Sequence, residues 1–255
     1  MRHCILALTL LMGAQIAVSD EAPGQDKAQG VLKFNISSGG YPPFTILSAD
    51  GNVSGIFWDT LSVIAQRLDL TLEPVQIPPK RSDSLLHQGY SDVTMRAIEW
   101  TSNPDEFAFS DPVLMTRDAI FVHQDNPRDI RTVEDLQGGT LLTRLGFSYP
   151  WLKEHIDSNK VSIIPVQRQQ PMFKRLYHGG ARFTGAVSNL HAGYWVLSTN
   201  PDWDNAIDEA PIRLEEVGLR LMFPPRHAGL VPEINRELAR LRQSGELDRI
   251  VNDYR

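Results

Sequence analysis

The sequence has little cysteine, no concentrated positive charge and no long apolar run beyond its N-terminal segment. Its single cysteine is Cys4, so the chain cannot form an internal disulfide, and a small disulfide-stapled domain is excluded. The 25 Lys and Arg residues are outnumbered by 31 Asp and Glu, and no basic block or stripe occurs. The net charge of −6 argues against nucleic acid or anionic lipid as a partner.

The N-terminus has the pattern of a secretory signal. A short basic start, Met1-Arg2-His3, precedes a mostly apolar run without acidic residues, and the small residues Ala17-Val18-Ser19 end it. We expect residues 1–19 to be a cleaved signal peptide, because the run is too short to span a membrane; the alternative is an N-terminal core helix. Cleavage would remove Cys4 and Arg2, which shifts the net charge from −6 to −7. A cysteine-free exported chain favours a bacterial periplasm.

Short apolar runs alternate with segments of helical periodicity along the rest of the chain. The pattern predicts strands at 31–37, 70–77, 91–95, 119–123, 140–143, 161–164, 182–187 and 219–223. It predicts helices at 56–68, 81–88, 149–157, 169–177, 190–197, 232–243 and 247–254, a helix start at Thr132, and a hairpin around residues 49–52. This order predicts an α/β fold with parallel strands, arranged as two lobes of about 100 residues each.

Several segments resemble a known family in their order and spacing. They are YPPF (41–44), GIFWDTLSVIAQRLDL (55–70), PPKRSDSLLHQGYSDV (78–93), FAFSDPVL (107–114), TVEDLQGGTLLTRLGFSYP (132–150) and EINRELARLRQSGELDRIVNDY (233–254). The chain is similar in these segments to the periplasmic solute-binding proteins of ABC importers, in family 3, which includes polar amino-acid binders. The resemblance covers nearly all of the chain after the signal.

The resemblance implies a type II periplasmic-binding-protein clamp, in which each lobe is a sheet flanked by helices. Lobe 1 would comprise residues 30–117 and 217–255, and lobe 2 residues 118–216. Two hinge strands, near 116–119 and 215–219, would join them, and closure on a small-molecule solute would signal to an ABC permease in the inner membrane. Such binders are usually monomers, and no cofactor or metal is expected.

In such a clamp, lobe 1 would contribute aromatic walls and a cation. The loop SSGGYPPFTI is stiffened by glycine and proline, and it would hold Tyr41 and Phe44 against the solute. Arg96 falls at a family contact position, where its guanidinium would hold an anion, and Glu99, three residues on, is a further candidate contact; the alternative is that Arg96 merely pairs with Glu99. Trp100 would stack on the solute or cover the hinge.

Lobe 2 would contribute a helix start and an arginine. We expect Gly146-Phe147-Ser148-Tyr149 to open a helix whose free amides seat an anion, with Ser148 as its cap and a donor to the solute. Arg144 corresponds to a family position that lines the cleft; as a plain exposed strand-end arginine it would have no such role.

Two departures from the family pattern bear on the solute. Amino-acid binders usually hold the α-carboxylate with an arginine where this chain has Asn103, and the α-ammonium with an aspartate where it has Asn189. Losing both charges argues against an ordinary amino-acid site, since buried charges need partners. We therefore expect a polar or anionic solute, with Asn189 still facing it.

Two other functions stay open. A few enzymes, including dehydratases, resemble this clamp, and one acting on a small carboxylic acid is an alternative, although no His-Glu-x-x-His, Gly-x-Ser-x-Gly or phosphate-binding glycine loop is present. The histidines also lack metal-ligand spacing. The second alternative is a sensor that reports its ligand to a membrane receptor.

Overall fold

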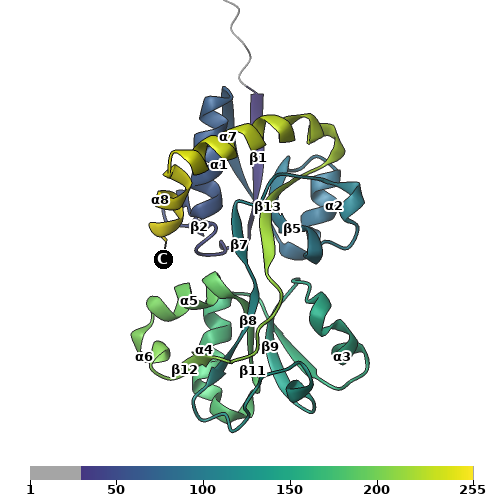
Figure 1. The fold of residues 1–255 in the computed structure, drawn as a ribbon, viewed down its shortest axis with the longest axis vertical. Coiled ribbons are helices and arrows are strands. Elements are labelled where there is room, and N and C mark those ends of the chain that lie inside the picture. The colour runs from purple at the N-terminus through teal and green to yellow at the C-terminus, as the bar shows by residue number, and fades with distance from the viewer. Residues whose placement is uncertain (1–29, 255) are drawn as a thin grey trace, which may run out of the picture.

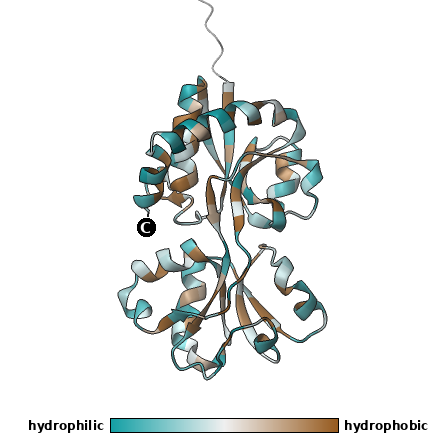
Figure 2. Ribbon diagram, viewed as in Figure 1, coloured by the Kyte–Doolittle hydropathy of each residue, from teal (hydrophilic) through white to brown (hydrophobic). Residues whose placement is uncertain are grey.

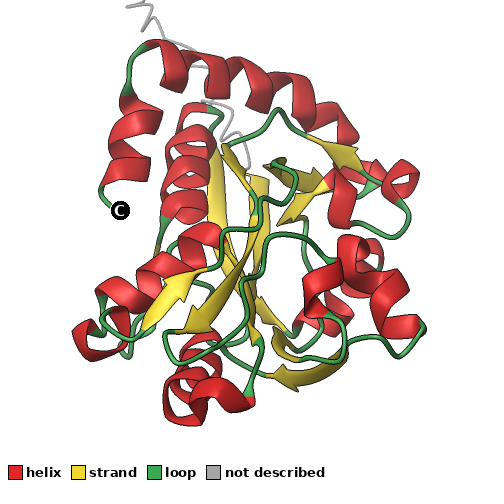
Figure 3. Ribbon diagram, turned by 60° about the horizontal axis from the view of Figure 1, so that its bottom comes forward, coloured by secondary structure: helices red, strands yellow, loops and turns green. Residues whose placement is uncertain are grey.

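The computed structural model describes residues 30–254, and the predicted signal peptide lies outside these residues. The described chain folds into two α/β bodies joined by crossing strands (Figure 1). We call them lobe 1 (residues 30–117 and 217–254) and lobe 2 (residues 118–216). Helices surround the strands of each lobe, so the predicted sheet-and-helix architecture is confirmed (Figure 3).

The sheet of lobe 1 has the order β4-β1-β5-β13-β6, with β7 also paired to β13. Its strands are β1 (Gly30–Ser37), β4 (Leu70–Ile77), β5 (Val93–Ala97), β6 (Ala108–Phe109), β7 (Leu114–Thr116) and β13 (Val217–Phe223). Strand β1 runs parallel to β4 and β5, whereas β13 runs antiparallel to its neighbours. The helices are α1 (Ile56–Arg67), α2 (Ser82–His87), α7 (Val231–Gln243) and α8 (Glu246–Asn252), and β2 (Ile46–Leu47) and β3 (Val53–Ser54) form the predicted hairpin.

Lobe 2 repeats this plan with the order β10-β9-β11-β8-β12. Its strands are β8 (Asp118–His123), β9 (Thr140–Arg144), β10 (Ser162–Val166), β11 (Gly185–Asn189) and β12 (Ile207–Glu209). Strand β9 is parallel to β10 and β11, and β8 is antiparallel to β11 and β12. Helices α3 (Lys153–Asp157), α4 (Gln169–Gly179), α5 (Leu190–Ser198) and α6 (Pro201–Asp204) cover it.

Proline and burial explain which strands lie outside and which inside. Pro74 and Pro165 lie in β4 and β10, the edge strands of the two sheets, where a missing backbone donor is tolerated. The central strands are apolar, and β13 has six buried residues in seven positions. Figure 2 shows brown, hydrophobic stretches along these strands and a mixture of brown and teal on the outer helices. The sheets therefore bury their apolar faces beneath amphipathic helices.

Two chain segments cross between the lobes side by side. On the outgoing path, β7 is followed by Arg117 and then by β8. On the return path, β13 begins at Val217, which pairs with Thr116 of β7. These segments coincide with the stretches expected to form the hinge. The lobes therefore connect through two adjacent strands, and we propose that they rotate about this pair.

Several element boundaries differ from the predictions. The helix expected at Thr132 is only a 3₁₀ turn, Glu134–Leu136. The Asp135 carboxylate accepts from the Thr132 amide (2.8 Å) as the predicted start requires, but the chain leaves the helical conformation before Gly138, whose φ is +71°. The strand expected at 182–187 starts later, at Gly185, since residues 180–182 form a 3₁₀ turn. Helix α6 and strand β12 were not predicted, because both are very short.

Candidate functional site

The candidate site lies where the carboxyl ends of strands from both sheets face one another. Strands β1 and β4 end at Ser37 and Ile77, and β11 ends at Asn189; all three residues line a cavity of about 80 Å³ between the lobes. We call it the cleft cavity. In open α/β sheets, ligands bind in the crevice beyond the carboxyl ends of parallel strands. The position of the cavity thus follows from the topology.

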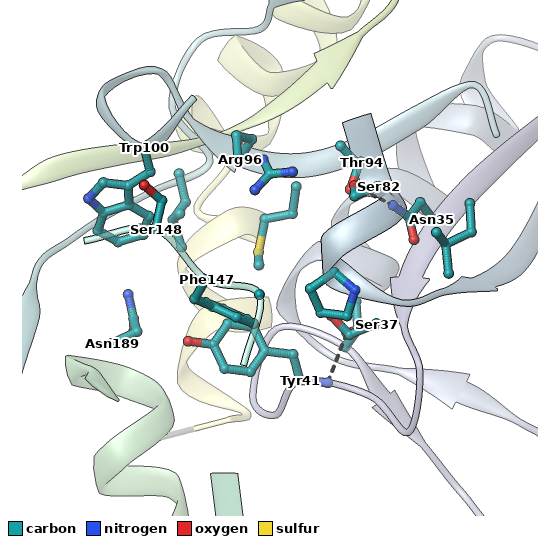
Figure 4. A pocket seen from close by; sticks show the side chains of 16 residues that line it. Asn35, Ser37, Tyr41, Ser82, Thr94, Arg96, Trp100, Phe147, Ser148 and Asn189 are labelled. Atoms are coloured by element: carbon teal, nitrogen blue, oxygen red, sulfur yellow. Dashed lines mark hydrogen bonds between the residues drawn. The ribbon is translucent and has the colours of Figure 1, made fainter. Parts of the chain in front are cut away.

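Tyr41 forms one wall of the cleft cavity (Figure 4). Its loop closes on itself, since the Tyr41 amide donates to the Thr45 carbonyl (2.7 Å) and the Phe44 amide donates to the Tyr41 carbonyl (3.0 Å). Tyr41 is only 6 % exposed, and burial raises the pKa of its hydroxyl. The ring contacts Phe147 of lobe 2, with ring centroids 5.1 Å apart. Tyr41 therefore touches both lobes.

Phe44 lies behind Tyr41 and does not line the cleft cavity. The side chain has no exposed surface and packs against Tyr41 and Phe57, with centroids 5.2 and 6.1 Å away. The expected contact between Phe44 and a solute does not follow from this position. Its role here is to support the Tyr41 ring from within the core of lobe 1.

Arg96 reaches into the cleft cavity from β5 (Figure 4). Its Nη2 donates to the Asp83 carboxylate on α2, so its ion-pair partner is Asp83 and the alternative pairing with Glu99 is wrong. The Nε of Arg96 is buried and has no hydrogen-bond partner. Asp83 thus holds one side of the guanidinium and leaves another donor unused.

Glu99 and Trp100 follow Arg96 in a 3₁₀ turn, Ile98–Trp100. Trp100 lines the cleft cavity and packs against the core of lobe 1, which agrees with either expected role. Glu99 is exposed and lines a neighbouring cavity of about 660 Å³, which we call the side cavity. The two cavities share Trp100, Gly146, Phe147 and Ser148.

The loop after β9 brings lobe 2 onto lobe 1. Gly146 has a φ of +83°, and a Cβ there would lie 2.8 Å from Cγ of Lys80. Glycine is required for this backbone angle and for so close an approach. The next two residues, Phe147 and Ser148, line both cavities. Tyr41, Arg96 and Ser148 therefore share one cavity.

The helix start predicted in this loop is different in the structure. The chain forms a 3₁₀ turn, Pro150–Leu152, before the short α3, and Tyr149 rather than Ser148 occupies the N-cap position. No side chain caps the turn, so the predicted Ser148 cap is wrong. Tyr149 instead lines the side cavity, and its hydroxyl accepts a hydrogen bond from the Arg144 amide (2.9 Å). Burial raises the pKa of Tyr149.

Arg144 is the last residue of β9 and is buried, with 4 % exposed surface. Its guanidinium carbon lies 5.1 Å from the centroid of Tyr41 and 4.8 Å from that of Phe147. Its Nη1 donates to Gln169 (3.2 Å), its Nε has no partner, and burial lowers its pKa. Arg144 lines the side cavity but not the cleft cavity. The alternative of a plain exposed arginine is wrong.

Asn189 lines the cleft cavity, but its amide is engaged in local bonds. Its Oδ1 accepts from the His191 amide (3.0 Å) and caps α5, and its Nδ2 donates to the Thr116 hydroxyl in β7 (2.9 Å). Asn189 therefore joins lobe 2 to the crossing strands. Asparagine is a favoured N-cap residue, which accounts for its type here.

Several polar side chains of the cavity wall were not predicted, namely Asn35, Ser37, Thr45, Ser82 and Thr94. Asn35, Ser82 and Thr94 are buried and line the cleft cavity, and the Asn35 Nδ2 donates to the Ser82 hydroxyl (2.7 Å; Figure 4). The Oδ1 of Asn35 is buried without a partner. For Asn35 the available signal is a polar residue between the apolar Phe34 and Ile36 of β1.

The part of the chain that the structure describes contains no cluster of His, Cys, Asp and Glu able to hold a metal ion. Within residues 30–254, no helix is both long and apolar enough to span a membrane.

Comparisons with known proteins agree with this fold. A family model described as "Bacterial extracellular solute-binding proteins, family 3" matches residues 35–255. A curated relative, the "Probable amino-acid-binding protein YxeM" of Bacillus subtilis (strain 168), is 22% identical over 253 residues, which cover 98% of this chain and 93% of the relative.

Solved structures share the fold. An ancestral arginine-binding protein bound to arginine matches with a TM-score of 0.76 and 21% identity, covering 89% of this chain and 98% of the other. A histidine kinase sensor domain with similarity to periplasmic binding proteins matches with a TM-score of 0.75 and 20% identity, covering 89% of this chain and 96% of the other. An ancestral amino-acid-binding protein, a precursor of cyclohexadienyl dehydratase, matches with a TM-score of 0.71 and 19% identity, covering 88% of this chain and 95% of the other. The predicted type II clamp fold is confirmed.

Proposed function

Because the chain belongs to family 3 of the bacterial extracellular solute-binding proteins, we propose that it captures a small polar or anionic solute between its lobes. The cleft cavity is the proposed site, and rotation about β7–β8 and β13 closes it. We further propose a periplasmic monomer, exported by cleavage of residues 1–19, that delivers the solute to an ABC-type permease. The family match and the N-terminal sequence support this location.

Arg96 is the observation that carries the preference for an anion. Among the described side chains that line the cleft cavity, it is the only charged one. Its ion pair with Asp83 fixes the guanidinium, while its buried Nε lacks an acceptor. A carboxylate or similar anion in the cavity pairs with the guanidinium, which Asp83 engages through Nη2 only.

The cavity offers no equivalent group to a positively charged solute. No aspartate or glutamate is among its described lining residues. Asn189, at the family's ammonium-binding position, has both ends of its amide bound to His191 and Thr116. An ammonium group here would be buried without a partner, which is unfavourable. The amino-acid-binding relative supports a small carboxylate, but this lining supports one that does not depend on an ammonium group.

Aromatic rings supply the apolar contact that the proposal needs. Tyr41, Trp100 and Phe147 come from both lobes and line the cavity together. Rings held by packing lose little conformational freedom when a solute binds, so their contact area converts efficiently into affinity. A solute held between them links the lobes and favours the closed arrangement.

We propose binding rather than catalysis. Members of the family are binding proteins. In addition, the described lining of the cleft cavity contains no carboxylate, histidine or lysine that would act as a general base. The bound solute should therefore be released unchanged.

The test is native mass spectrometry of the protein from a periplasmic extract, followed by calorimetry with the retained compound. We expect a small anionic or polar molecule, and we expect Arg96→Gln to weaken its binding at least tenfold. The melting temperature should hardly change, since the Asp83 side chain is 41% exposed and stays hydrated without its partner. Arg182→Gln, which removes an exposed arginine of lobe 2, is the matched control. Unchanged affinity in Arg96→Gln would show that Arg96 does not hold the solute.

A further inference from the structure

Arg144 places a second positive charge at the edge of the proposed site, from the opposite lobe. Its guanidinium lies against Tyr41 of lobe 1 and Phe147 of lobe 2, at 5.1 and 4.8 Å from the ring centroids. Aromatic faces attract cations, because the ring face carries the negative part of its quadrupole. Arg144 thus occupies the cation position that these two rings offer.

Arg144 makes no ion pair with a carboxylate in the described part of the chain. Its side chain donates to the neutral amide of Gln169, and its Nε has no partner. The buried carboxylate of lobe 2, Asp118, instead accepts from the indole of Trp151 (2.9 Å). Although burial lowers the pKa of Arg144, a guanidinium stays protonated in proteins. The rings therefore hold a permanent cation without an ion-pair partner among the described residues.

The same two rings line the cleft cavity, so the effect of Arg144 reaches the solute. A solute in the cavity has Arg96 on the lobe 1 side and Arg144 beyond the rings on the lobe 2 side. Because Arg96 is already paired with Asp83, the added positive charge near the cavity is that of Arg144, which repels a cationic group and attracts an anionic one. An ammonium or guanidinium group would also find one face of each ring already used.

We propose that Arg144 is a specificity-determining residue that acts on the far end of the solute, meaning the end opposite the carboxylate that Arg96 holds. It excludes solutes whose far end is cationic and selects those whose far end is anionic or neutral. The inference rests on the proposed function and deepens it, because it assigns the charge preference of the site to a residue outside the cavity lining. It separates this site from one that accepts basic amino acids such as arginine.

The test varies the far end of a carboxylate while keeping its head constant. The probes are glutarate, glutaramate and 5-aminopentanoate, together with L-glutamate, L-glutamine and L-ornithine, each titrated by calorimetry into wild type, Arg144→Met and Arg144→Lys. Within each set, wild type should prefer the members with an anionic or amide far end over the member with an ammonium group at its far end by at least tenfold. Arg144→Met should reduce that preference at least tenfold, and Arg144→Lys should retain it, because the charge is kept.

Each outcome decides the inference. An unchanged preference in a folded Arg144→Met variant overturns it. Tight binding of 5-aminopentanoate or L-ornithine by wild type overturns it as well. The proposed function survives in both cases if Arg96→Gln still weakens binding. If no probe binds and native mass spectrometry finds no retained solute, the proposed function fails and the inference fails with it. Arg144→Gln replaces Arg144→Met if circular dichroism shows that the latter does not fold.

Discussion

Replacing the buried carboxylate of Asp118 with an amide should stabilise the protein at neutral pH. Asp118 begins β8 at the crossing strands and is 6 % exposed. Its Oδ2 accepts from the Trp151 indole (2.9 Å), which lowers the pKa, but burial raises it more, to about 6 from 3.8. An asparagine keeps the shape and can still accept from Trp151, so Asp118→Asn removes the charge and little else.

The size and sign of the effect follow from that shift. Because the folded-state pKa is above the unfolded one, the contribution of Asp118 to stability is fully present below pH 3.8 and is lost as the pH rises through 6. The shift corresponds to a loss of ~3 kcal/mol in the free energy of unfolding at pH 8, and ~1.4 kcal/mol of this loss is regained at pH 5. We therefore expect Asp118→Asn to be more stable than wild type by up to ~3 kcal/mol at pH 8, with an advantage ~1.4 kcal/mol smaller at pH 5.

Urea unfolding followed by circular dichroism at pH 5, 6, 7 and 8 measures this difference. Asp208→Asn, at an exposed carboxylate in β12 of the same lobe, is the control and should show no comparable pH dependence. If the difference between wild type and Asp118→Asn were the same at every pH, the reasoning from buried charge would be refuted. A less stable variant at pH 8 would refute it as well.

Three further predictions concern packing and closure. Phe44→Ala should lower the free energy of unfolding by about 3–5 kcal/mol, because the side chain is fully buried; a loss below about 1 kcal/mol in urea unfolding would contradict the packing role. Gly146→Ala should weaken solute binding at least tenfold and keep the lobes apart in small-angle scattering, because the new Cβ would lie 2.8 Å from Cγ of Lys80; wild-type affinity would contradict this contact. Asn189→Ala should lower the unfolding free energy by about 1–2 kcal/mol through loss of the α5 cap, whereas Asn189→Asp should lose less; equal losses by thermal unfolding would speak against the cap.

Much of the fold was predictable because its strands and helices differ clearly in period and length. Helix α1 and strand β4 lie within one residue of their predicted ranges. The helix ends shortly before Asp69, and the strand ends just before Pro78. The segment after Thr132 was predicted too long, because a start signal such as the Thr132–Asp135 contact does not show how soon the helix ends, here before Gly138 with its φ of +71°. Elements of two to four residues, such as β6 and α6, carry too few residues for a periodic signal.

The site was predictable only in part, because its geometry depends on contacts between distant segments. Tyr41 and Arg96 could be placed from the loop and strand that carry them. The pairing of Arg96 with Asp83 could not, since it depends on how α2 packs beside β5. The contact of Arg144 with Tyr41 joins residues of different lobes, and no local pattern encodes it. Tyr41 and Phe44 lie in the same loop, and the sequence does not show which ring lines the cavity and which packs in the core.

Strand β13 also sets the order in which the molecule can be completed. It lies between β5 and β6 in lobe 1, yet its residues, 217–223, follow all of lobe 2 in the sequence. During synthesis, when the N-terminal end emerges first, the uninterrupted segment 118–216 contains every strand that its own sheet needs. The earlier-emerging strands of the other sheet must wait with open edges until residue 223 has appeared. A chain cut before residue 217 would thus retain one finished sheet and one with unpaired, aggregation-prone borders.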